Sequence, residues 1–282
     1  MTRLLWAVVL APAALLAQEQ ETIHKTFSGA RSIEIDNVNG SIHVTGFDGA
    51  EIQMDAHKTL TADNEDRAAA ARREVKLDIT EAGGDVRVYV DGPFRCHCED
   101  RRSFRDRNNT NEHGRRGYKV AYDFEVKVPR TVAVYLSTIN QGRINVEKTG
   151  GDFDVENING SIQMDDIAGS GRVYALNGKV AVSFVKNPER ASYFGSLNGS
   201  VDVWFQPDLS ADASVKTFNG GIYTDFPVTY MPLKQLASGE RHEGKFVYKS
   251  NSFQGVRIGN GGPELKFENF NGDIRIRNRG QK

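Results

Sequence analysis

The 282-residue chain lacks the sequence marks of an enzyme or of a nucleic-acid-binding protein. It has no nucleophile elbow, no phosphate-binding glycine loop and no dinucleotide fingerprint. Its formal net charge is only −1, so no overall field draws it to nucleic acid or to an anionic membrane. Nothing in the sequence supports catalysis, and we expect no cofactor and no nucleic-acid partner.

Proline is scarce, with 8 residues, whereas glycine is common, with 28. This balance is typical of a turn-rich β protein and not of a disordered tail. Hydrophobic residues make up 39% of the chain, which is enough to bury a core. The length fits one elongated domain or one and a half ordinary domains.

Long apolar runs are missing except at the N-terminus. Arg3 precedes an apolar run at 4–16, which is too short to span a bilayer of about 30 Å as a stable helix. We therefore expect residues 1–17 to be a signal peptide that is cleaved after Ala17; a buried strand or an uncleaved anchor is the alternative. No cysteine follows the run, which argues against a lipoprotein. The mature chain would then be exported to the periplasm, cell surface or medium, with no transmembrane segment.

One short motif returns along the chain. It consists of an apolar residue, Asn-Gly, any residue, and then a β-branched apolar residue followed by polar and apolar residues in alternation. Its copies contain Asn39-Gly40, Asn159-Gly160, Asn177-Gly178, Asn198-Gly199, Asn219-Gly220 and Asn271-Gly272, with a looser copy at Asn140-Gln141-Gly142. The steps from Asn140 to Asn159, Asn177, Asn198 and Asn219 are 19, 18, 21 and 21 residues. A fixed period of this kind indicates a repeat architecture.

The residues around each Asn-Gly pair argue against a simple hairpin. In a two-residue hairpin the flanking residues face the same side, but Ile158 is apolar and Ser161 is polar. We therefore predict that each pair is a structural turn that bends the chain around a shared core, with its glycine at positive φ. Copies one period apart would stack, Asn on Asn, into an all-β, β-helix-like solenoid with coils of about 20 residues. A β-sandwich of hairpins is the alternative.

The repeats also resemble those of a known family. The Asn-Gly copies, together with the strand-like residues 124–129 and Gly259-Asn260-Gly261-Gly262-Pro263, are similar to the bacterial putative adhesin family of β-strand-repeat proteins. The resemblance covers roughly residues 30–280. It implies a β-solenoid at the cell envelope, and it implies no catalytic residues.

The N-terminal half is expected to be a β region at 18–130 with two interruptions. Residues 63–74 predict one short helix, since Asp63 can cap it, acidic residues come early and arginines come late. Residues 92–117 are rich in arginine and acids and almost free of aliphatic residues, which indicates a long exposed insertion.

The C-terminal half, 131–282, is expected to hold the repeat block. An excursion at 226–256 interrupts it, and the copy at 267–277 would close it. We expect this last copy to cap the end of the stack, because charged side chains protect an open sheet edge. The charges are Arg275, Arg277, Arg279 and Lys282.

Two features of the insertion could carry chemistry. Cys96 and Cys98 flank His97; they could form a disulfide within the loop or between chains, hold zinc or copper with nearby His113, or have no special role. An arginine cluster could bind an anionic polymer or could simply be solvated. Its members are Arg95, Arg101, Arg102, Arg105, Arg107, Arg115 and Arg116.

Two further sets lie in the repeat block. Four aspartates could hold calcium or act on sugars, although solvent-facing acids are common on strands. They are Asp152, Asp154, Asp165 and Asp166. Four aromatic residues could form a sugar-stacking stripe, or could pack in the core or pair across strands. They are Tyr174, Tyr193, Trp204 and Tyr223.

The export segment, the stacked repeats and the missing catalytic motifs together predict an exported, non-enzymatic envelope or surface protein with an adhesin-like binding or scaffold role. Its partner would be an envelope polysaccharide, a surface ligand or a second copy of the chain. The alternatives are a periplasmic sensor or regulatory partner in an envelope-stress system, and a polysaccharide-active enzyme on a β-helix.

Overall fold

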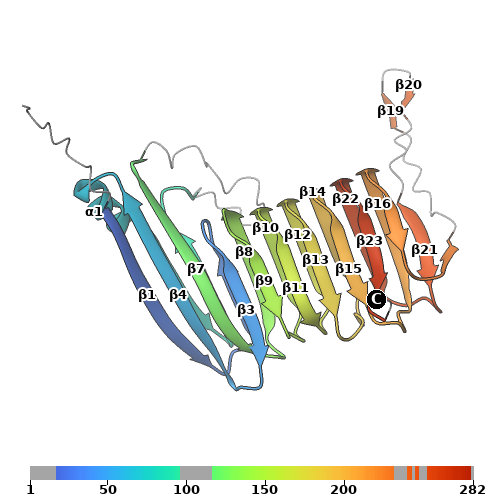
Figure 1. Ribbon diagram of the computed structural model, residues 1–282, viewed down its shortest axis with the longest axis horizontal. Coiled ribbons are helices and arrows are strands. Elements are labelled where there is room, and N and C mark those ends of the chain that lie inside the picture. Colours follow the sequence, from blue (N-terminus) through green and yellow to red (C-terminus); the bar gives the residue numbers. More distant parts are fainter. Residues whose placement is uncertain (1–16, 96–115, 232–239, 243–244, 248–252, 281–282) are drawn as a thin grey trace, which may run out of the picture. The chain divides into compact units, whose positions relative to one another are not determined.

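The computed structural model describes residues 17–95, 116–231, 240–242, 245–247 and 253–280 (Figure 1). In this part the chain is all-β with one helix, which confirms the all-β part of the prediction. All but the last residue of the expected signal peptide at 1–17 lies outside the described residues, as do Cys96, His97 and Cys98.

Two large sheets contain nearly all the strands. Sheet A has, in spatial order, β1 (Ala17–Ser28), β4 (Glu51–Ala62), β7 (Tyr118–Pro129), β3 (Ile42–Phe47), β9 (Ile144–Glu147), β11 (Ile162–Ile167), β13 (Val180–Phe184), β15 (Val201–Phe205), β23 (Ile274–Asn278) and β17 (Ile222–Thr224). Sheet B has β18 (Val228–Tyr230), β21 (Gln254–Ile258), β16 (Ala211–Asn219), β22 (Glu264–Asn271), β14 (Ser192–Asn198), β12 (Gly171–Asn177), β10 (Phe153–Asn159), β8 (Ala133–Asn140), β2 (Ser32–Asp36), β6 (Asp85–Asp91) and β5 (Lys76–Ala82). A separate small sheet pairs β19 (Glu240–His242) with β20 (Lys245–Val247).

The chain divides into two compact units. The smaller unit has described residues 17–21, 58–76, 91–95 and 116–120, and the remaining described residues form the larger unit. The smaller unit contains helix α1 (Glu65–Glu74), close to the position that the sequence predicts.

Local sequence explains where α1 begins and ends. Asn64, and not the expected Asp63, is its N-cap: its side chain accepts a hydrogen bond of 3.0 Å from the backbone N–H of Arg67. Acidic residues occupy the first turn and arginines the last, as the helix dipole favours. The side chain of Arg72 near the C-terminal end pairs with Glu19 and Glu65.

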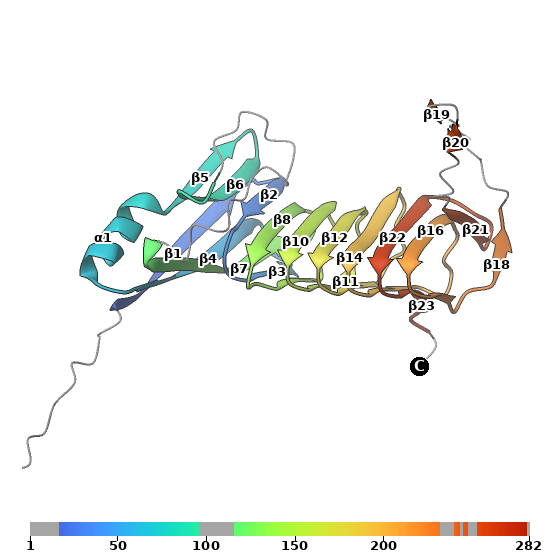
Figure 2. The ribbon, with the colours of Figure 1, turned by 90° about the horizontal axis from the view of Figure 1, so that it is seen from above.

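Each Asn-Gly turn of the larger unit joins a strand of one sheet to a strand of the other (Figure 2). On one side of the turn at Asn159, β10 pairs in parallel with β8 and β12. On the other side, β11 pairs in parallel with β9 and β13. The two strands that flank the turn therefore do not form a hairpin. The result is a sandwich-like arrangement of two mixed sheets, whose neighbouring repeat strands run parallel.

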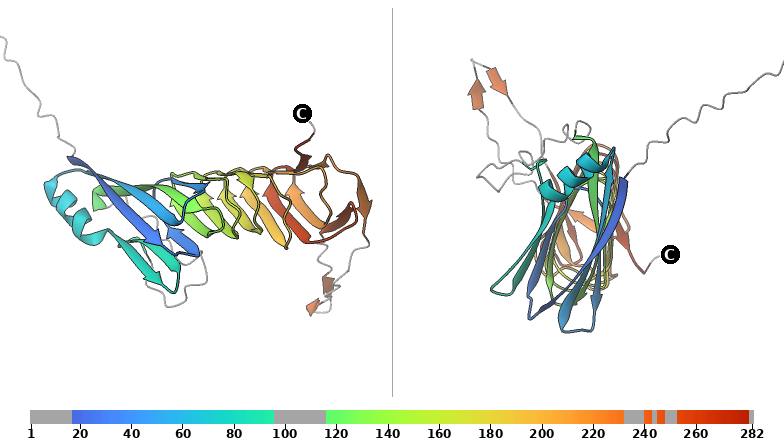
Figure 3. Two further views of the ribbon diagram at one scale, coloured as in Figure 1. Left: turned by 90° about the horizontal axis from the view of Figure 1, so that it is seen from below. Right: turned by 90° about the vertical axis from the view of Figure 1, so that its left-hand side faces the viewer.

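The hydrophobic core of the larger unit lies between the two sheets (Figure 3). Alternate residues of each strand point inward, so the period-two pattern of the sequence becomes one buried face per sheet. The rings of Phe184 in sheet A and Phe194 in sheet B are 5.9 Å apart, and those of Phe205 and Phe267 are 6.4 Å apart. All four side chains are fully buried, and burial of one such ring stabilises the fold by about 1.5–3 kcal/mol.

The last copy of the motif does not cap the stack, contrary to the prediction. Strand β22 lies between β14 and β16, and β23 lies between β15 and β17. Asn271 thus stands between Asn198 and Asn219 in space. An internal position lets the last copy pair along both of its edges, whereas the end of the stack would leave one edge unpaired. The excursion ends in β21, which pairs antiparallel with both β16 and β18.

The early copy at Asn39 also belongs to the stack, although it is about 100 residues away from the next copy in the sequence. Strand β2 pairs in parallel with β8, and β3 with β9, so this copy lies beside the copy at Asn140. Asn39 and Asn140 form a parallel bridge. The intervening stretch of about 100 residues leaves the stack and returns to it, which a search for a fixed period does not detect.

The predicted reason for glycine in the turns, a positive φ, holds for some of the Asn-Gly pairs but not for most of them. Among the six Asn-Gly pairs, only Gly40 and Gly272 have φ in the left-handed region, at +111° and +136°. At Gly178 the obstacle is the neighbouring copy: a Cβ would lie 2.0 Å from the carbonyl oxygen of Gly160. A Cβ on Gly199 would lie 2.1 Å from the carbonyl oxygen of Gly178. Glycine is therefore required by the close stacking of one turn on the next.

The predicted stacking of Asn on Asn is present. Five turn asparagines donate from Nδ2 to Oδ1 of the asparagine before them in the stack, at 2.7–3.2 Å. The order of this ladder in space is Asn140, Asn159, Asn177, Asn198, Asn271 and Asn219. Such side-chain amides satisfy one another at the edge of the sheets.

A second, buried ladder runs two residues before the first. Here a hydroxyl or amide donates to the carbonyl oxygen of a turn glycine in the neighbouring copy. Thr138 donates to Gly40 at 3.0 Å, Asn157 to Gly142 at 3.0 Å, Ser196 to Gly178 at 2.9 Å, Asn269 to Gly199 at 2.7 Å and Thr217 to Gly272 at 3.1 Å. Because a buried carbonyl needs a partner, this ladder stabilises the close approach of the turns.

Candidate functional site on the outer face of sheet B

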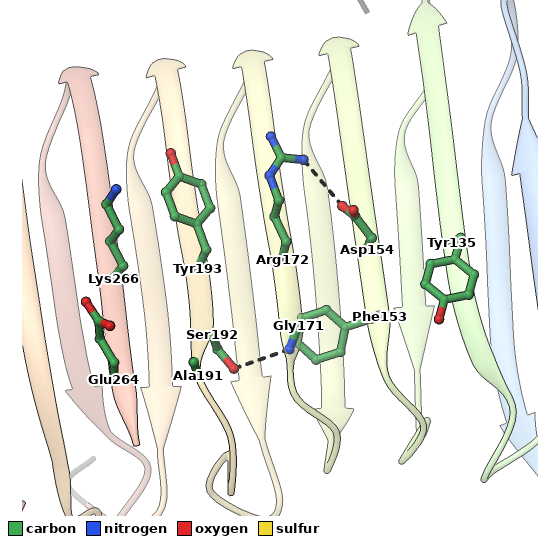
Figure 4. A pocket seen from close by; sticks show the side chains of 10 residues that line it. All are labelled: Tyr135, Phe153, Asp154, Gly171, Arg172, Ala191, Ser192, Tyr193, Glu264 and Lys266. Carbon is green, nitrogen blue, oxygen red and sulfur yellow. Dashed lines mark hydrogen bonds and ion pairs between the residues drawn. The ribbon is translucent and has the colours of Figure 1, made fainter. Parts of the chain in front are cut away.

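One row of side chains crosses the outer face of sheet B. The parallel registers place Asp154 beside Tyr135 and Arg172, Arg172 beside Tyr193, and Tyr193 beside Lys266 (Figure 4). Residues in one register position on parallel strands share a face, with about 4.8 Å between neighbours. Five successive strands, from β8 to β22, thus contribute one outward side chain each.

A hollow of about 470 Å³ lies along this row (Figure 4). Phe153, Gly171, Ala191 and Ser192 line its middle. The hydroxyl of Ser192 accepts a hydrogen bond of 3.2 Å from the backbone N–H of Gly171. Tyr135 and Asp154 stand toward one end of the row, and Glu264 and Lys266 stand at the other. The hollow is therefore open, with a mainly apolar lining and charged side chains toward its ends.

Arg172 is the central side chain of the row. It lies 3.3 Å from both Asp154 and Glu156, and its guanidinium carbon lies 5.2 Å from the ring centre of Tyr174 and 5.6 Å from that of Tyr193. Burial disfavours the charged guanidinium, but Glu156 and Asp154 outweigh this effect and raise the pKa of Arg172. The group stays charged and is fixed in place from several sides.

The two tyrosines beside Arg172 lie over a residue that has no side chain. The rings of Tyr174 and Tyr193 are 6.5 Å apart, and a Cβ on Gly195 would lie 2.7 Å from the hydroxyl oxygen of Tyr193. Burial raises the pKa of Tyr193, and the nearby carboxylate of Glu268 acts in the same direction. The Tyr193 hydroxyl is therefore a neutral donor, 3.5 Å from Glu268.

The lysines on this face are also close to carboxylates and aromatic rings. Lys266 lies 3.9 Å from Glu268 and 4.5 Å from the ring centre of Phe253. Lys216, on β16, lies 3.6 Å from Glu268 and 5.4 Å from the same ring. The face combines cations, carboxylates and aromatic rings without an excess of positive charge.

Two side chains at the hollow remain open to a ligand. Tyr135 is 40% exposed, and within the described part of the chain its ring has no ring–ring or cation–π contact. Glu264 is exposed and makes no ion pair with any described residue. An open aromatic face and an open carboxylate are the groups that could meet a ligand first.

The four predicted aspartates do not form one site. Asp154 and Asp152 belong to the side of sheet B and pair with Arg172 and Arg190 respectively. Asp165 accepts from Gln163 at 2.7 Å and Asp166 pairs with Arg279 at 3.0 Å, both on the side of sheet A. Among the described residues, no three His, Cys, Asp or Glu side chains are grouped as a metal site would require.

The four predicted aromatic residues do not form one stripe, because they lie on opposite sheets. Tyr174 and Tyr193 pair across strands on sheet B. Trp204 and Tyr223 belong to sheet A, where Arg277 lies 5.6 Å from the centre of the Trp204 ring and Arg275 lies 5.7 Å from that of Tyr223. The expectation that they fill the core is wrong for Tyr223, which is 56% exposed.

The arginines of the last copy pair with carboxylates of neighbouring strands. They do not form a charged end cap, because β23 lies between β15 and β17. Asp202 on β15 is almost fully buried and lies 2.8 Å from Lys179, 3.4 Å from Arg275 and 4.0 Å from Arg277. Arg279 reaches Asp166 as described above. These contacts hold the last copy in its internal position.

Both ends of the arginine-rich insertion differ from the expected exposed loop. Phe94 and Arg95 are buried, and Arg116 is half-buried and pairs with Glu74 at 3.3 Å. The other members of the arginine cluster lie outside the described residues. The disulfide, metal and unassigned interpretations of Cys96 and Cys98 therefore stay predictions.

Tyr135, Arg172 and Lys266 were not singled out in the sequence, although a signal for them is present. Tyr135, Asp154, Arg172, Tyr193 and Lys266 each stand five residues before the asparagine of their own turn. Aligning the copies on the asparagine would have placed all five in one row. The order of that row, with Lys266 next to Tyr193, follows only from the internal position of β22.

No family model matches the chain, and no curated protein matches it. Among solved structures, a putative adhesin from Bacteroides fragilis is similar over 92% of this chain and 97% of its own, at 10% identity and a TM-score of 0.41. A putative cell adhesion protein from Clostridium sporogenes covers 93% and 100%, at 10% identity and a TM-score of 0.35. A putative lipid binding protein from Parabacteroides distasonis covers 91% and 96%, at 12% identity and a TM-score of 0.22.

These likenesses are too weak to decide the fold or the function of this chain, and membership of the Asn-Gly repeat family stays a prediction. Within the described part of the chain, no helix is long and apolar enough to cross a membrane.

Proposed function

We propose that this chain is an exported, non-enzymatic binding protein of the cell envelope, with an adhesin-like role. The observation that carries the proposal is the hollow on the outer face of sheet B, which is built by side chains from successive repeats. A concave site with a mainly apolar lining and a few fixed polar groups is the usual form of a ligand site.

The same proposal takes the repeat block as a β-solenoid. The parallel registers between successive copies, the asparagine ladder and the turns that pass from sheet B to sheet A support this architecture. A stack of this kind presents a long, regular outer surface, which suits binding to an extended ligand.

The arrangement of the carboxylates favours binding over hydrolysis. Glycosidases place two carboxyl groups about 5–9.5 Å apart across the bond that is cleaved. Asp154 and Glu264 belong to β10 and β22, which β12 and β14 separate, so they are about 14 Å apart or more at the usual strand spacing. Asp154 and Glu156 are closer to each other, but both are hydrogen-bonded to Arg172.

Protease treatment of intact cells tests the adhesin-like role. The segment 92–117 contains seven arginines, so trypsin has many sites there. We expect trypsin added to intact producing cells to cleave the chain, with a cytoplasmic protein as the intactness control. Cleavage only after the outer membrane has been permeabilised would overturn the surface role and leave a periplasmic partner as the function to pursue.

A further inference from the structure

We infer that the hollow on the outer face of sheet B binds a neutral polysaccharide, lying across the strands. This inference rests on the proposed function and names the class of its ligand. It is drawn from three features of the hollow: its charge balance, its open aromatic ring and the direction of its row of polar groups.

The charge balance disfavours an acidic polymer. Arg172 and Lys266 line the hollow together with two carboxylates, Asp154 and Glu264. Glu156, Glu268 and Lys216 adjoin them, so these seven charged groups are four carboxylates and three cations. An anionic ligand would meet no excess of positive charge, and each of the three cations is already close to a carboxylate. The hollow therefore fits a ligand without charge.

The polar groups suit hydroxyls. Carboxylates accept hydrogen bonds from sugar hydroxyls, and the guanidinium and ammonium groups donate to them. Arg172 is fixed by Asp154, Glu156 and two tyrosine rings, so little side-chain freedom would be lost on binding. Donors and acceptors that are fixed beforehand recognise hydroxyls better than mobile ones do.

Tyr135 supplies the aromatic platform. Its ring is 40% exposed at one end of the hollow (Figure 4), whereas the rings of Tyr174 and Tyr193 are already covered by Arg172. A sugar ring has a face of C–H groups that packs on an aromatic face while its hydroxyls point to the rim. Tyr135 is thus the side chain whose loss should weaken binding most.

The row runs at right angles to the strands. Tyr135, Asp154, Arg172, Tyr193 and Lys266 follow one another from strand to strand, at about 4.8 Å per step. A linear polymer laid along this row meets a polar or aromatic group at each step. A single sugar would reach only part of it, so affinity should rise with chain length.

The test measures binding of the purified chain to a fixed panel of polysaccharides by isothermal titration and affinity electrophoresis. The neutral members are dextran, mannan, xyloglucan and cello-oligosaccharides of increasing length; the acidic members are hyaluronan, alginate and heparin. The variants are Tyr135→Ala and Glu264→Gln, both on exposed side chains. The matched control is Tyr223→Ala, an exposed tyrosine on sheet A. Thermal melting checks that each variant is folded.

We expect at least one neutral polysaccharide to bind and none of the acidic ones. Tyr135→Ala should weaken binding by about tenfold or more, as loss of an anchoring aromatic contact does, and Tyr223→Ala should leave it unchanged. Raising NaCl from about 50 mM to about 500 mM should change the affinity by less than about twofold, because no net charge pairing is involved.

The outcomes separate the two proposals. Binding of an acidic polysaccharide that depends on Tyr135 would overturn the neutral class and leave the hollow as the binding site. Binding of a neutral polysaccharide that neither Tyr135→Ala nor Glu264→Gln weakens would overturn the site. Binding to no member of the panel would overturn the inference, whereas the surface role would still be decided by the protease experiment.

Discussion

The inner and outer faces of sheet B are built from the same strands but follow different rules. Inward, successive copies place Val155, Val173, Phe194 and Phe267 at one register position, all fully buried. Outward, the neighbouring position holds Asp154, Arg172, Tyr193 and Lys266, which are one acid, two cations and one phenol. The inner face needs only apolar side chains that fit, so it repeats; the outer face is free to vary, and its combination of side chains is what can recognise a ligand.

Replacing a ring on the inner face should have the largest effect on stability. Phe194 is fully buried and contacts the rings of Phe184, Phe205 and Phe267. Phe194→Ala should lower the free energy of unfolding by about 3–5 kcal/mol, through lost burial and the cavity left behind. Urea denaturation measures this, and a loss below about 1 kcal/mol would contradict a core shared between the two sheets.

Filling a turn glycine should come next. Gly178→Val puts a Cβ 2.0 Å from the carbonyl oxygen of Gly160, so the turns must move apart at a cost of about 3 kcal/mol. Gly150→Ala is the control, because a Cβ there meets nothing closer than 3.4 Å and φ is not in the left-handed region. The account requires the melting temperature to fall for Gly178→Val and to stay nearly constant for Gly150→Ala.

A buried charge on sheet A should make stability depend on pH. Burial alone would raise the pKa of Asp202, but Lys179 and Arg275 outweigh it and hold this pKa below its ordinary value. The ionised carboxylate therefore stabilises the fold fully above its unfolded pKa of about 3.9, and this contribution is lost as pH falls through the lower folded pKa. Between about pH 2 and about pH 5, the melting temperature should depend less steeply on pH for Asp202→Asn than for the unmodified chain.

The dependence of the melting temperature on pH should also become less steep in Lys179→Gln, since that change removes the closest cation, 2.8 Å from Asp202. If the melting temperature fell equally steeply with decreasing pH in both variants and in the unmodified chain, Asp202 would not contribute to the loss of stability at low pH.

Changing the outer face should have the smallest effect on stability. Tyr135 is 40% exposed and borders the hollow, so Tyr135→Ala should change the free energy of unfolding by less than about 0.5 kcal/mol. The same variant is the one expected to weaken binding most. A large fall in its melting temperature would mean that the outer face is part of the stabilising core, and the contrast between the faces would then be wrong.

Much of the fold could be predicted from the motif itself. The period near 20 residues, the alternation around Ile162 and Val180 and the unequal flanks of Asn159-Gly160 indicated stacked copies with Asn on Asn, and the ladders confirm this. The internal position of the copy at Asn271 could not be predicted, because this copy and the one at Asn219 have the same local pattern. Their order in space is set by strand pairing, since β22 pairs with β14 on one edge and with β16 on the other.

The site was harder to predict than the fold. Tyr174, Tyr193 and Asp154 were candidates, but they were grouped by residue type with side chains that the structure places on the other sheet. Side-chain type does not reveal the sheet to which a residue belongs; its offset from the turn asparagine does. The turn glycines show the same limit, because the carbonyl that Gly178 must avoid belongs to a different copy.

Hydroxyl-radical footprinting of the purified chain, with and without the tightest-binding neutral polysaccharide of the panel, is the most direct test of the contrast between the faces. Ligand should reduce oxidation of Tyr135 and Tyr193 on the outer face of sheet B and leave Trp204 and Tyr223 on sheet A unchanged. Protection of Trp204 and Tyr223, with Tyr135 and Tyr193 oxidised as before, would show that the ligand binds to the other sheet and would contradict the account.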